Sequence, residues 1–288
     1  MIVARTPEQL EPAERAIAIG TFDGVHRGHR AVIQAAVDTG LRSTVVTFNP
    51  HPRTVLGYEV EILSSVERRI ELVSDVGPDE LLLVEFTLGL SRLSPEEFVQ
   101  KVLAPLGARV VLAGENFRFG RGREGDVEML RRLGFEVHAV PLVDGVSSSQ
   151  IRSLISAGDV RQAAALLGRP FELEGTVVAG DRRGGTLGFP TANLTVDLRA
   201  VVPAYGIYAG WTLRHPVAMS IGVNPHYGGI ERRIEAHVLD FDGDLYGRQL
   251  RIGVWERLRA ERAFETEAAL VAQITADVEA ARRATRPA

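Results

Sequence analysis

Short apolar runs alternate with amphipathic stretches in the first half of the chain. The apolar runs, rich in Val, Leu, Ile and Ala, predict strands over residues 16–19, 43–48, 80–85, 109–113 and 136–141. Between them, apolar positions that recur every three or four residues predict helices over residues 28–37, 65–75 and 95–103. Continuous apolar strands separated by helices are typical of a parallel sheet covered on both faces. We therefore expect a doubly wound, Rossmann-like α/β domain.

Two short helices are predicted where this pattern ends. They cover residues 149–156 and 160–167, and Asp159 is suited to cap the start of the second. Gly168 and Pro170 then end that helix. We place the domain boundary at Gly168, which gives domains of residues 1–168 and 169–288.

The second domain has a β pattern until its last residues. Residues 171–254 contain short apolar segments, many glycines and frequent turn signals, as in small β-barrels. Asp242-Gly243 predicts a hairpin between two of these strands. Residues 266–282 return to a helical pattern, with Leu270, Ile274 and Val278 on one stripe.

Composition narrows the range of functions. The 288 residues are 45% hydrophobic and 24% charged, with a net charge of −4 and no cysteine. That charge offers no general attraction for a nucleic acid or an anionic membrane, so we expect small-molecule substrates as partners. Residues 1–16 do not resemble a signal peptide and no apolar run is long enough for a membrane span, so we expect a cytoplasmic protein. The sequence leaves open an association of copies into a homo-oligomer.

Arginine supplies nearly all of the positive charge. Lys101 is the one lysine, and it lies in a helical stretch without a glycine loop beside it. A phosphate-binding lysine loop or a lysine Schiff base is therefore not expected. Phosphate groups would have to be bound by arginine, histidine, backbone amides or a metal ion.

The strongest chemical signal is the segment Ile19-Gly-Thr-Phe-Asp-Gly-Val-His-Arg-Gly-His29, where the first predicted strand meets the first helix. Ligands of open α/β sheets bind at such strand ends, and a helix start offers free amides to phosphate. His26 and His29 can face one side and donate to phosphate oxygens. Two alternatives remain open here: solvated histidines, or a metal site completed by His51. The nucleotide-binding candidates from this segment are Gly20, Phe22, Asp23, Gly24 and Gly28.

Three further segments follow in order: Thr47-Phe-Asn-Pro-His-Pro52, Gly114-Glu-Asn-Phe-Arg-Phe-Gly120 and Ser147-Ser-Ser-Gln-Ile-Arg152. Together with residues 19–29, they resemble the signatures of the HIGH-type nucleotidylyltransferases, in the form found in bacterial FAD synthetases. The resemblance covers the whole first domain. It implies transfer of an adenylyl group from ATP to FMN, with His26 and His29 as catalytic residues.

The resemblance also assigns roles to the later segments. It makes Asn116 a ligand for a ring or ribose, and the segment of Ser147, Ser148, Ser149 and Arg152 a clamp on the phosphates of ATP, with Arg152 catalytic. Each assignment has a structural alternative. The serines can simply cap a helix. Asp23, which can hold Mg²⁺ or the leaving group, can instead form a turn with Gly24. Of Phe117 and Phe119, we expect at least one to belong to the core.

The second domain contains Gly188-Phe-Pro-Thr-Ala-Asn-Leu194. Thr191 and Asn193 are two apart, so a strand would present both on one face, where their oxygens suit Mg²⁺. Alone, this segment is more typical of a turn. Its neighbours at residues 175–181, 203–210, 235–241 and 244–247 give the order found in the riboflavin kinase module, a small β-barrel, which the chain resembles.

By that resemblance, Thr191 and Asn193 bind Mg²⁺ and ATP, and Glu235 is the general base that takes the proton of the ribityl hydroxyl. Glu235 can also be read as a surface residue of an alternating strand. Two places depart from the family pattern. Gly185 stands where the kinases usually have arginine, and Val223 and His226 stand where threonines are common.

We therefore expect a bifunctional riboflavin kinase/FMN adenylyltransferase that makes FAD, with riboflavin, FMN and ATP as substrates and Mg²⁺ as cofactor. The departures motivate one alternative, an adenylyltransferase whose barrel is inactive as a kinase. A non-catalytic flavin-binding or regulatory protein is a second. A metal-dependent hydrolase built on His26, His29 and His51 is a third.

Overall fold

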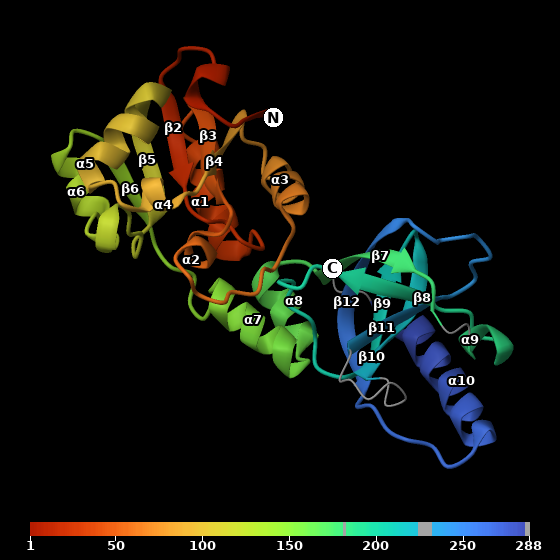
Figure 1. Ribbon diagram of the computed structural model, residues 1–288. Helices are drawn as coiled ribbons and strands as arrows, with labels where there is room; N and C mark the ends of the chain where they lie inside the picture. The colour runs from red at the N-terminus through yellow and green to blue at the C-terminus, as the bar shows by residue number, and fades with distance from the viewer. Residues whose placement is uncertain (181–182, 224–231, 286–288) are drawn as a thin grey trace. The chain divides into compact units, whose positions relative to one another are not determined.

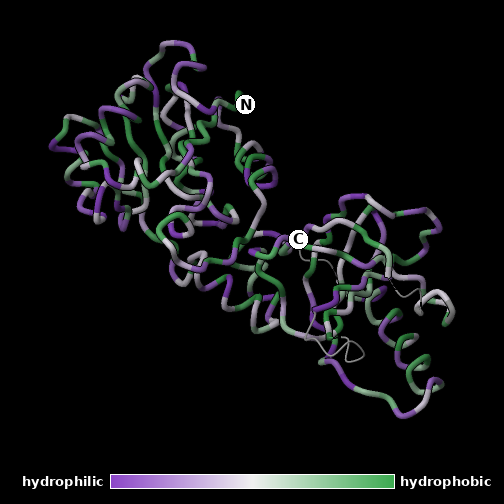
Figure 2. Tube along the Cα trace, in the orientation of Figure 1, coloured by the Kyte–Doolittle hydropathy of each residue, from purple (hydrophilic) through white to green (hydrophobic). Residues whose placement is uncertain are grey.

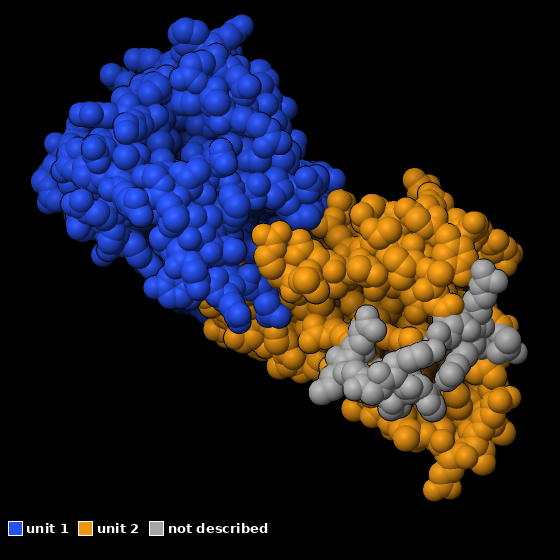
Figure 3. Space-filling view, in the orientation of Figure 1, with its two compact units in different colours: residues 1–148 blue, residues 149–288 orange. Residues whose placement is uncertain are grey.

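The computed structural model describes residues 1–180, 183–223 and 232–285. The chain divides into two compact units, Met1–Ser148 and Ser149–Ala288 (Figure 3). No helix in the described ranges is both long and apolar enough to cross a membrane. Apolar residues concentrate on the strands, and hydrophilic residues are frequent on the outer loops (Figure 2).

The first unit is built on one six-stranded parallel sheet with the strand order β1-β4-β3-β2-β5-β6. The strands are β1 (Ile2–Ala4), β2 (Arg15–Ile19), β3 (Arg42–Asn49), β4 (Glu80–Glu85), β5 (Ala108–Gly114) and β6 (Glu136–Val140). This confirms the doubly wound α/β prediction. The short edge strand β1 was not predicted, because three residues are too few to show a period.

Helices cover both faces of this sheet (Figure 1). They are α1 (Arg27–Val37), α2 (Pro52–Val55), α3 (Val66–Ser74), α4 (Leu88–Ser91), α5 (Pro95–Phe98) and α6 (Val127–Arg132), with short turns η1 (Pro7–Gln9), η2 (Val99–Leu103), η3 (Ala104–Leu106) and η4 (Arg121–Arg123). The helix predicted over residues 95–103 is divided, because α5 continues into the π-helical turn η2.

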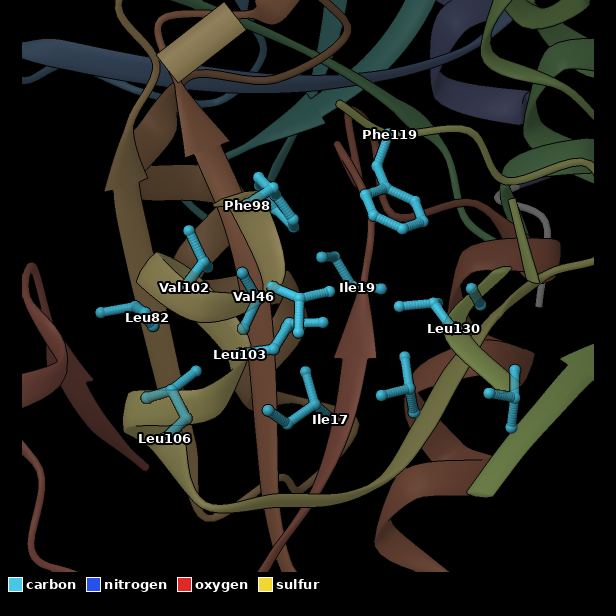
Figure 4. Packing of buried hydrophobic residues seen from close by; sticks show 14 of the residues in the cluster. Ile17, Ile19, Val46, Leu82, Phe98, Val102, Leu103, Leu106, Phe119 and Leu130 are labelled. Carbon is cyan, nitrogen blue, oxygen red and sulfur yellow. The ribbon is translucent and has the colours of Figure 1, made fainter. Parts of the chain in front are cut away.

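The two faces of β2 explain why the sheet is buried on both sides. Ile17 and Ile19 enter one apolar cluster, which also contains Phe98 and Leu130 from α5 and α6 (Figure 4). Ala16 and its alternate neighbours face the opposite cluster, formed with α1 and α3. Alternation along a strand sends neighbouring side chains to opposite faces, so both faces need a helical cover.

The strand order places the topological switch point beside β2. The chain proceeds from β2 to β3 and β4 on one side, and then crosses back to place β5 and β6 on the other. The loops after β2 and β5 therefore diverge at the carboxyl edge of the sheet, which is where open α/β sheets bind ligands.

The opposite edge of the sheet contains a buried ion pair. Arg15 Nε donates to Glu80 Oε2 at 2.7 Å, and the Thr44 hydroxyl donates to the same oxygen at 2.7 Å. Arg15 and Glu80 are each 1% exposed. This network ties β2, β3 and β4 together at their amino-terminal ends, away from the switch-point edge.

The second unit consists of a helical pair and a closed six-stranded barrel. The pair is α7 (Ser148–Ala157), which starts at the last residue of the first unit, and α8 (Val160–Leu167). The barrel has the order β10-β11-β8-β7-β12-β9, with β7 (Phe171–Val178), β8 (Ala192–Val196), β9 (Gly206–Thr212), β10 (His215–Val223), β11 (Arg232–Val238) and β12 (Gln249–Arg259). The short helix α9 (Arg183–Thr186) lies between β7 and β8. The barrel prediction is confirmed.

The predicted hairpin at Asp242-Gly243 is wrong. β11 pairs with β10 and β8, whereas β12 pairs with β7 and β9, so the strands on either side of this turn are not neighbours. Both edges of β11 are already occupied when the barrel closes, and β12 must fill the gap between β7 and β9. A local turn signal does not report which strand edges are free.

The predicted terminal helix is α10 (Glu267–Arg283). It packs against β9, β10 and β12 on the outside of the barrel. Its main polar anchor is Asp277, 6% exposed, which accepts hydrogen bonds from Arg259 Nε at 2.9 Å and Nη2 at 2.7 Å.

Candidate active sites

The loop after β2 has an unusual backbone. Phe22, Gly24 and Val25 have φ values of 50°, 77° and 38°, so two non-glycine residues occupy the left-handed region. Such conformations cost free energy and persist only where the surroundings enforce them, often at functional sites. At Gly24, a Cβ would also stand 2.8 Å from the Cβ of Leu63, so glycine is required there.

Asp23 holds this loop in place. Its side-chain oxygens lie 3.0 and 3.1 Å from the Leu63 amide nitrogen, which donates to them, and the residue is only 3% exposed. The Gly24 amide donates to Ser64 Oγ at 3.2 Å. These contacts anchor the loop to the segment before α3, and the part of Asp23 in metal or leaving-group binding stays a prediction.

A second anchor acts on the carbonyl of Thr21. The Thr47 hydroxyl and Arg69 Nη1 both donate to this oxygen, each at 2.9 Å. Arg69 lies on α3 and is 5% exposed, and its burial lowers the pKa of its guanidinium below the ordinary arginine value. Thr47 lies in one of the predicted signature segments, residues 47–52, but no role was predicted for it. Leu63, Ser64 and Arg69 were not predicted from the sequence.

The two histidines lie together at the start of α1. His26 is the N-cap, and its Nδ1 accepts from the His29 amide at 3.2 Å. Their rings stack with centroids 3.5 Å apart, and the rings of Phe22 and His29 meet in a T-shaped arrangement with centroids 5.3 Å apart. The Phe22 side chain is buried and contacts His29 from the core. Its side chain is therefore not accessible to a ligand. The sequence-predicted pair is thus brought to one place, beside the amides of a helix start.

The segment after β5 forms the other side of the switch point. Asn116 is exposed there, two residues beyond the strand end. Phe119 is buried in the core, and Phe117 stacks on it with ring centroids 5.7 Å apart. This confirms the expectation that at least one of the two phenylalanines is a core residue.

The serine segment reaches the glycine loop through Ser148. Its hydroxyl donates to the carbonyl of Asp23 at 3.1 Å, which brings two of the sequence-predicted segments together within the first unit. Ser147 lies just before α7 and is exposed. Ser149 and Arg152 lie in the first turns of α7, in the second unit, and Arg152 is half-buried there.

The histidines do not form a metal centre. No group of three or more His, Asp or Glu side chains in the described part of the chain is arranged to hold a metal ion. His51 instead caps α2, where its Nδ1 accepts from the Arg53 amide at 3.2 Å. His51 thus does not join His26 and His29 in one group of metal ligands.

The barrel gathers its predicted residues on its outer face. Glu235 of β11 lies directly opposite Asn193 of β8 and, on its other side, opposite Ser220 of β10. All three are half-buried, whereas the alternate residues Ile234 and Ala236 fill the barrel interior. Directly opposed side chains have Cβ atoms about 5 Å apart, so the carboxylate and the amide share one site.

The segment before β8 is packed tightly. A Cβ at Gly180 would lie 2.1 Å from Asn193 Nδ2, and a Cβ at Gly184 would lie 2.4 Å from the carbonyl oxygen of Phe189. His237, two residues after Glu235, has Nδ1 2.8 Å from the carbonyl oxygen of Pro190, and its ring meets Phe189 edge-on at 5.7 Å. Gly180 and His237 lie in two of the segments that resemble the riboflavin kinase module, but no role was predicted for either, although the two-residue period from Glu235 places His237 on the same face.

Comparison with known proteins assigns both parts of the chain to known families. The family model of FAD synthetase matches residues 8–154, and the family model of riboflavin kinase matches residues 167–285. A bifunctional riboflavin kinase/FMN adenylyltransferase of Listeria monocytogenes is 36% identical, with 94% of this chain and 93% of the relative covered. This chain belongs to that family. It is therefore a transferase of FAD biosynthesis.

A second relative and one solved structure also match over nearly the whole chain. The bifunctional riboflavin kinase/FMN adenylyltransferase of Escherichia coli K12 is 34% identical, with 91% of this chain and 90% of the relative covered. A crystal structure described as a macrolide-efflux protein from Streptococcus pneumoniae is 30% identical, with a TM-score of 0.89 and 99% of each chain covered. The two chains thus share a fold.

The departures from the riboflavin kinase pattern lie in different surroundings. Gly185 faces open space, because nothing lies within 4 Å of a Cβ built there. Val223 is the last residue of β10 and pairs with Arg232 of β11. His226 lies outside the described residues.

Proposed function

We propose that this chain makes FAD from riboflavin in two ATP-dependent steps carried out at separate sites. The barrel phosphorylates riboflavin to FMN, and the parallel-sheet domain adenylylates FMN and releases pyrophosphate. We assign adenylyl transfer to residues 1–168 and phosphorylation to residues 169–288. The observation that supports the proposal is the stacked pair of His26 and His29 at the switch point of the first unit, together with the directly opposed Glu235 and Asn193 on the barrel of the second.

In the adenylyl step, an oxygen of the FMN phosphate attacks the α-phosphorus of ATP while the bond to pyrophosphate breaks. Charge then grows on the leaving group. His26 and His29, at the start of α1, are positioned to donate to these oxygens together with the helix amides. Gly20 and Gly28 allow close approach, Asn116 binds the ring or ribose, and the serine segment with Arg152 clamps the phosphates.

In the kinase step, the ribityl hydroxyl oxygen attacks the γ-phosphorus of ATP and ADP leaves. Glu235 takes the proton of this hydroxyl, and Asn193 and Thr191 hold the nucleotide phosphates. The register supports this division of roles, because it sets an acceptor carboxylate directly beside a short amide on a rigid sheet.

The kinase residues also suit Mg²⁺. Hydroxyl, carboxamide and carboxylate oxygens are suitable ligands for Mg²⁺. Thr191, just before β8, and Asn193, directly opposite Glu235, supply the first two. When bound, Mg²⁺ neutralises phosphate charge. Thr191 and Asn193 are the residues we assign to hold it.

Substitution of His29 tests the adenylyl site. In His29→Ala, we expect FAD formation from FMN to fall by two or more orders of magnitude, on the order of what loss of a positioned charge-stabilising donor costs. FMN formation from riboflavin should stay at the wild-type level, because Glu235 and Asn193 lie in the other unit. Both products are measured by chromatography of one reaction mixture.

Two results would contradict the proposal. Undiminished FAD formation by His29→Ala would remove the histidine from the mechanism, and equal loss of both products would contradict separate sites. The inactive-barrel alternative predicts a third pattern: wild-type protein that makes FAD from FMN but makes no FMN from riboflavin.

A further inference from the structure

The guanidinium of Arg69 lies beneath the glycine loop of the adenylyl site. The residue is 5% exposed, and its Nη1 donates to the carbonyl of Thr21 at 2.9 Å. The Thr47 hydroxyl donates to the same oxygen from β3 at 2.9 Å. Two segments outside the loop thus fix one loop carbonyl.

Burial of the Arg69 guanidinium costs free energy, because the cation loses its hydration. Desolvation lowers the pKa of Arg69, while the charges of Asp23 and Glu67 act in the opposite direction. Its buried Nε has no hydrogen-bond partner within the described part of the chain. A core built for stability alone would place an apolar side chain at such a position.

Phe22 links the Thr21 carbonyl to the ring of His29. Thr21 is followed by Phe22, whose φ of 50° is strained and whose ring is 1% exposed. That ring presses against Gly20, where a Cβ would stand 3.1 Å from it, and its edge supports His29. Release of the Thr21 carbonyl would let this strained backbone relax, and the support of His29 would move with it.

We propose that Arg69 is a positioning residue for adenylyl transfer, which holds the Thr21 carbonyl so that Phe22 keeps His29 in place. The positive charge of Arg69, buried next to the loop that we propose binds the phosphates of ATP, also stabilises the bound anion. The inference rests on the proposed role of His29.

The test compares full-length Arg69→Met, Arg69→Lys and Thr47→Val with the wild type. We expect Arg69→Met to lose on the order of 10²-fold in kcat for FMN adenylylation, the scale of an approximately 1 Å misplacement. Arg69→Lys, which retains the charge, should recover part of kcat, and Thr47→Val, which removes the second donor, should lose less than Arg69→Met. Riboflavin phosphorylation in the same samples should not change.

A matched control separates positioning from loss of stability. Thr44 is buried in the same strand as Thr47, but its hydroxyl donates to Glu80 at the opposite edge of the sheet. We expect Thr44→Val to lower the melting temperature without lowering kcat for adenylylation. If Arg69→Met does not fold, Arg69→Ala assayed with and without added guanidinium ion replaces it, and recovery of kcat by guanidinium is the expected result.

Two outcomes would overturn the inference. One is wild-type kcat in folded Arg69→Met or Arg69→Ala. The other is a loss in Thr44→Val as large as in the Arg69 variants, which would make the effect one of stability. His29→Ala, assayed alongside, separates failure of the proposed site from failure of the Arg69 inference. If His29→Ala keeps full activity, the proposed function of the site fails. If His29→Ala loses activity and the Arg69 variants do not, only the role of Arg69 fails.

Discussion

At the residue scale, strand pairing sets the position of the carboxylate that we propose as the base of the kinase site. Glu235 faces outward because Ile234 and Ala236 fill the interior, and register places it opposite Asn193. A residue on the outer face of a β-barrel contributes little to its core. Its substitution therefore probes chemistry with small effects on folding.

Glu235→Gln should lose FMN formation by roughly 10²–10⁴-fold, because the amide cannot take a proton from the attacking hydroxyl. Conversion of supplied FMN to FAD should be unaffected. Glu174→Gln is the matched control, since Glu174 is also half-buried on the outside of the barrel and pairs with Arg251 at 3.0 Å. Riboflavin phosphorylation by Glu235→Gln at the wild-type rate would exclude it as the base.

At the scale of elements, the connection between β7 and β8 sets the position of Asn193. Gly180 leaves no room for a Cβ, which would stand 2.1 Å from Asn193 Nδ2. Gly185, in the same connection, has open space around it. These two glycines offer a paired experiment on one segment.

We expect Gly180→Ala to displace the Asn193 amide and to reduce riboflavin phosphorylation by on the order of 10²-fold, while Gly185→Ala leaves it unchanged. FAD formation from FMN should be retained by both variants. Equal activity of Gly180→Ala and Gly185→Ala would contradict the placement of Asn193 at the kinase site. The measurement is the initial rate of FMN formation at several ATP concentrations, which separates kcat from KM.

The elements were largely predictable, because each is encoded by a local period. The strand at residues 80–85 and the helix at residues 160–167 have the predicted bounds. The failures involve contacts between distant segments. Asp242-Gly243 looks like a hairpin, but which strands pair is decided by barrel closure.

The same distinction applies to the sites. His26, His29 and Glu235 could be proposed from the sequence because they lie in contiguous motifs. Arg69 could not, because the role we propose for it depends on a contact with Thr21, 48 positions earlier, and nothing near it in sequence signals that contact.

At the scale of the whole molecule, the histidine pair lies in one compact unit and the Glu235–Asn193 pair in the other, and FMN is the product of one step and the substrate of the other. The shared intermediate gives a reason for joining the two units in one chain. It requires only that FMN released by the barrel be available to the sheet domain. Direct transfer between the sites is not needed.

The most direct test of the account is a chromatographic time course of the wild-type protein with riboflavin, ATP and Mg²⁺, run beside a reaction started from FMN. We predict that riboflavin is converted first to FMN and then, after a lag, to FAD, and that the FMN-fed reaction forms FAD without the lag. Formation of FAD only in the FMN-fed reaction would contradict a working kinase site at Glu235 and Asn193. Absence of FAD from both reactions would contradict the adenylyl site at His26 and His29.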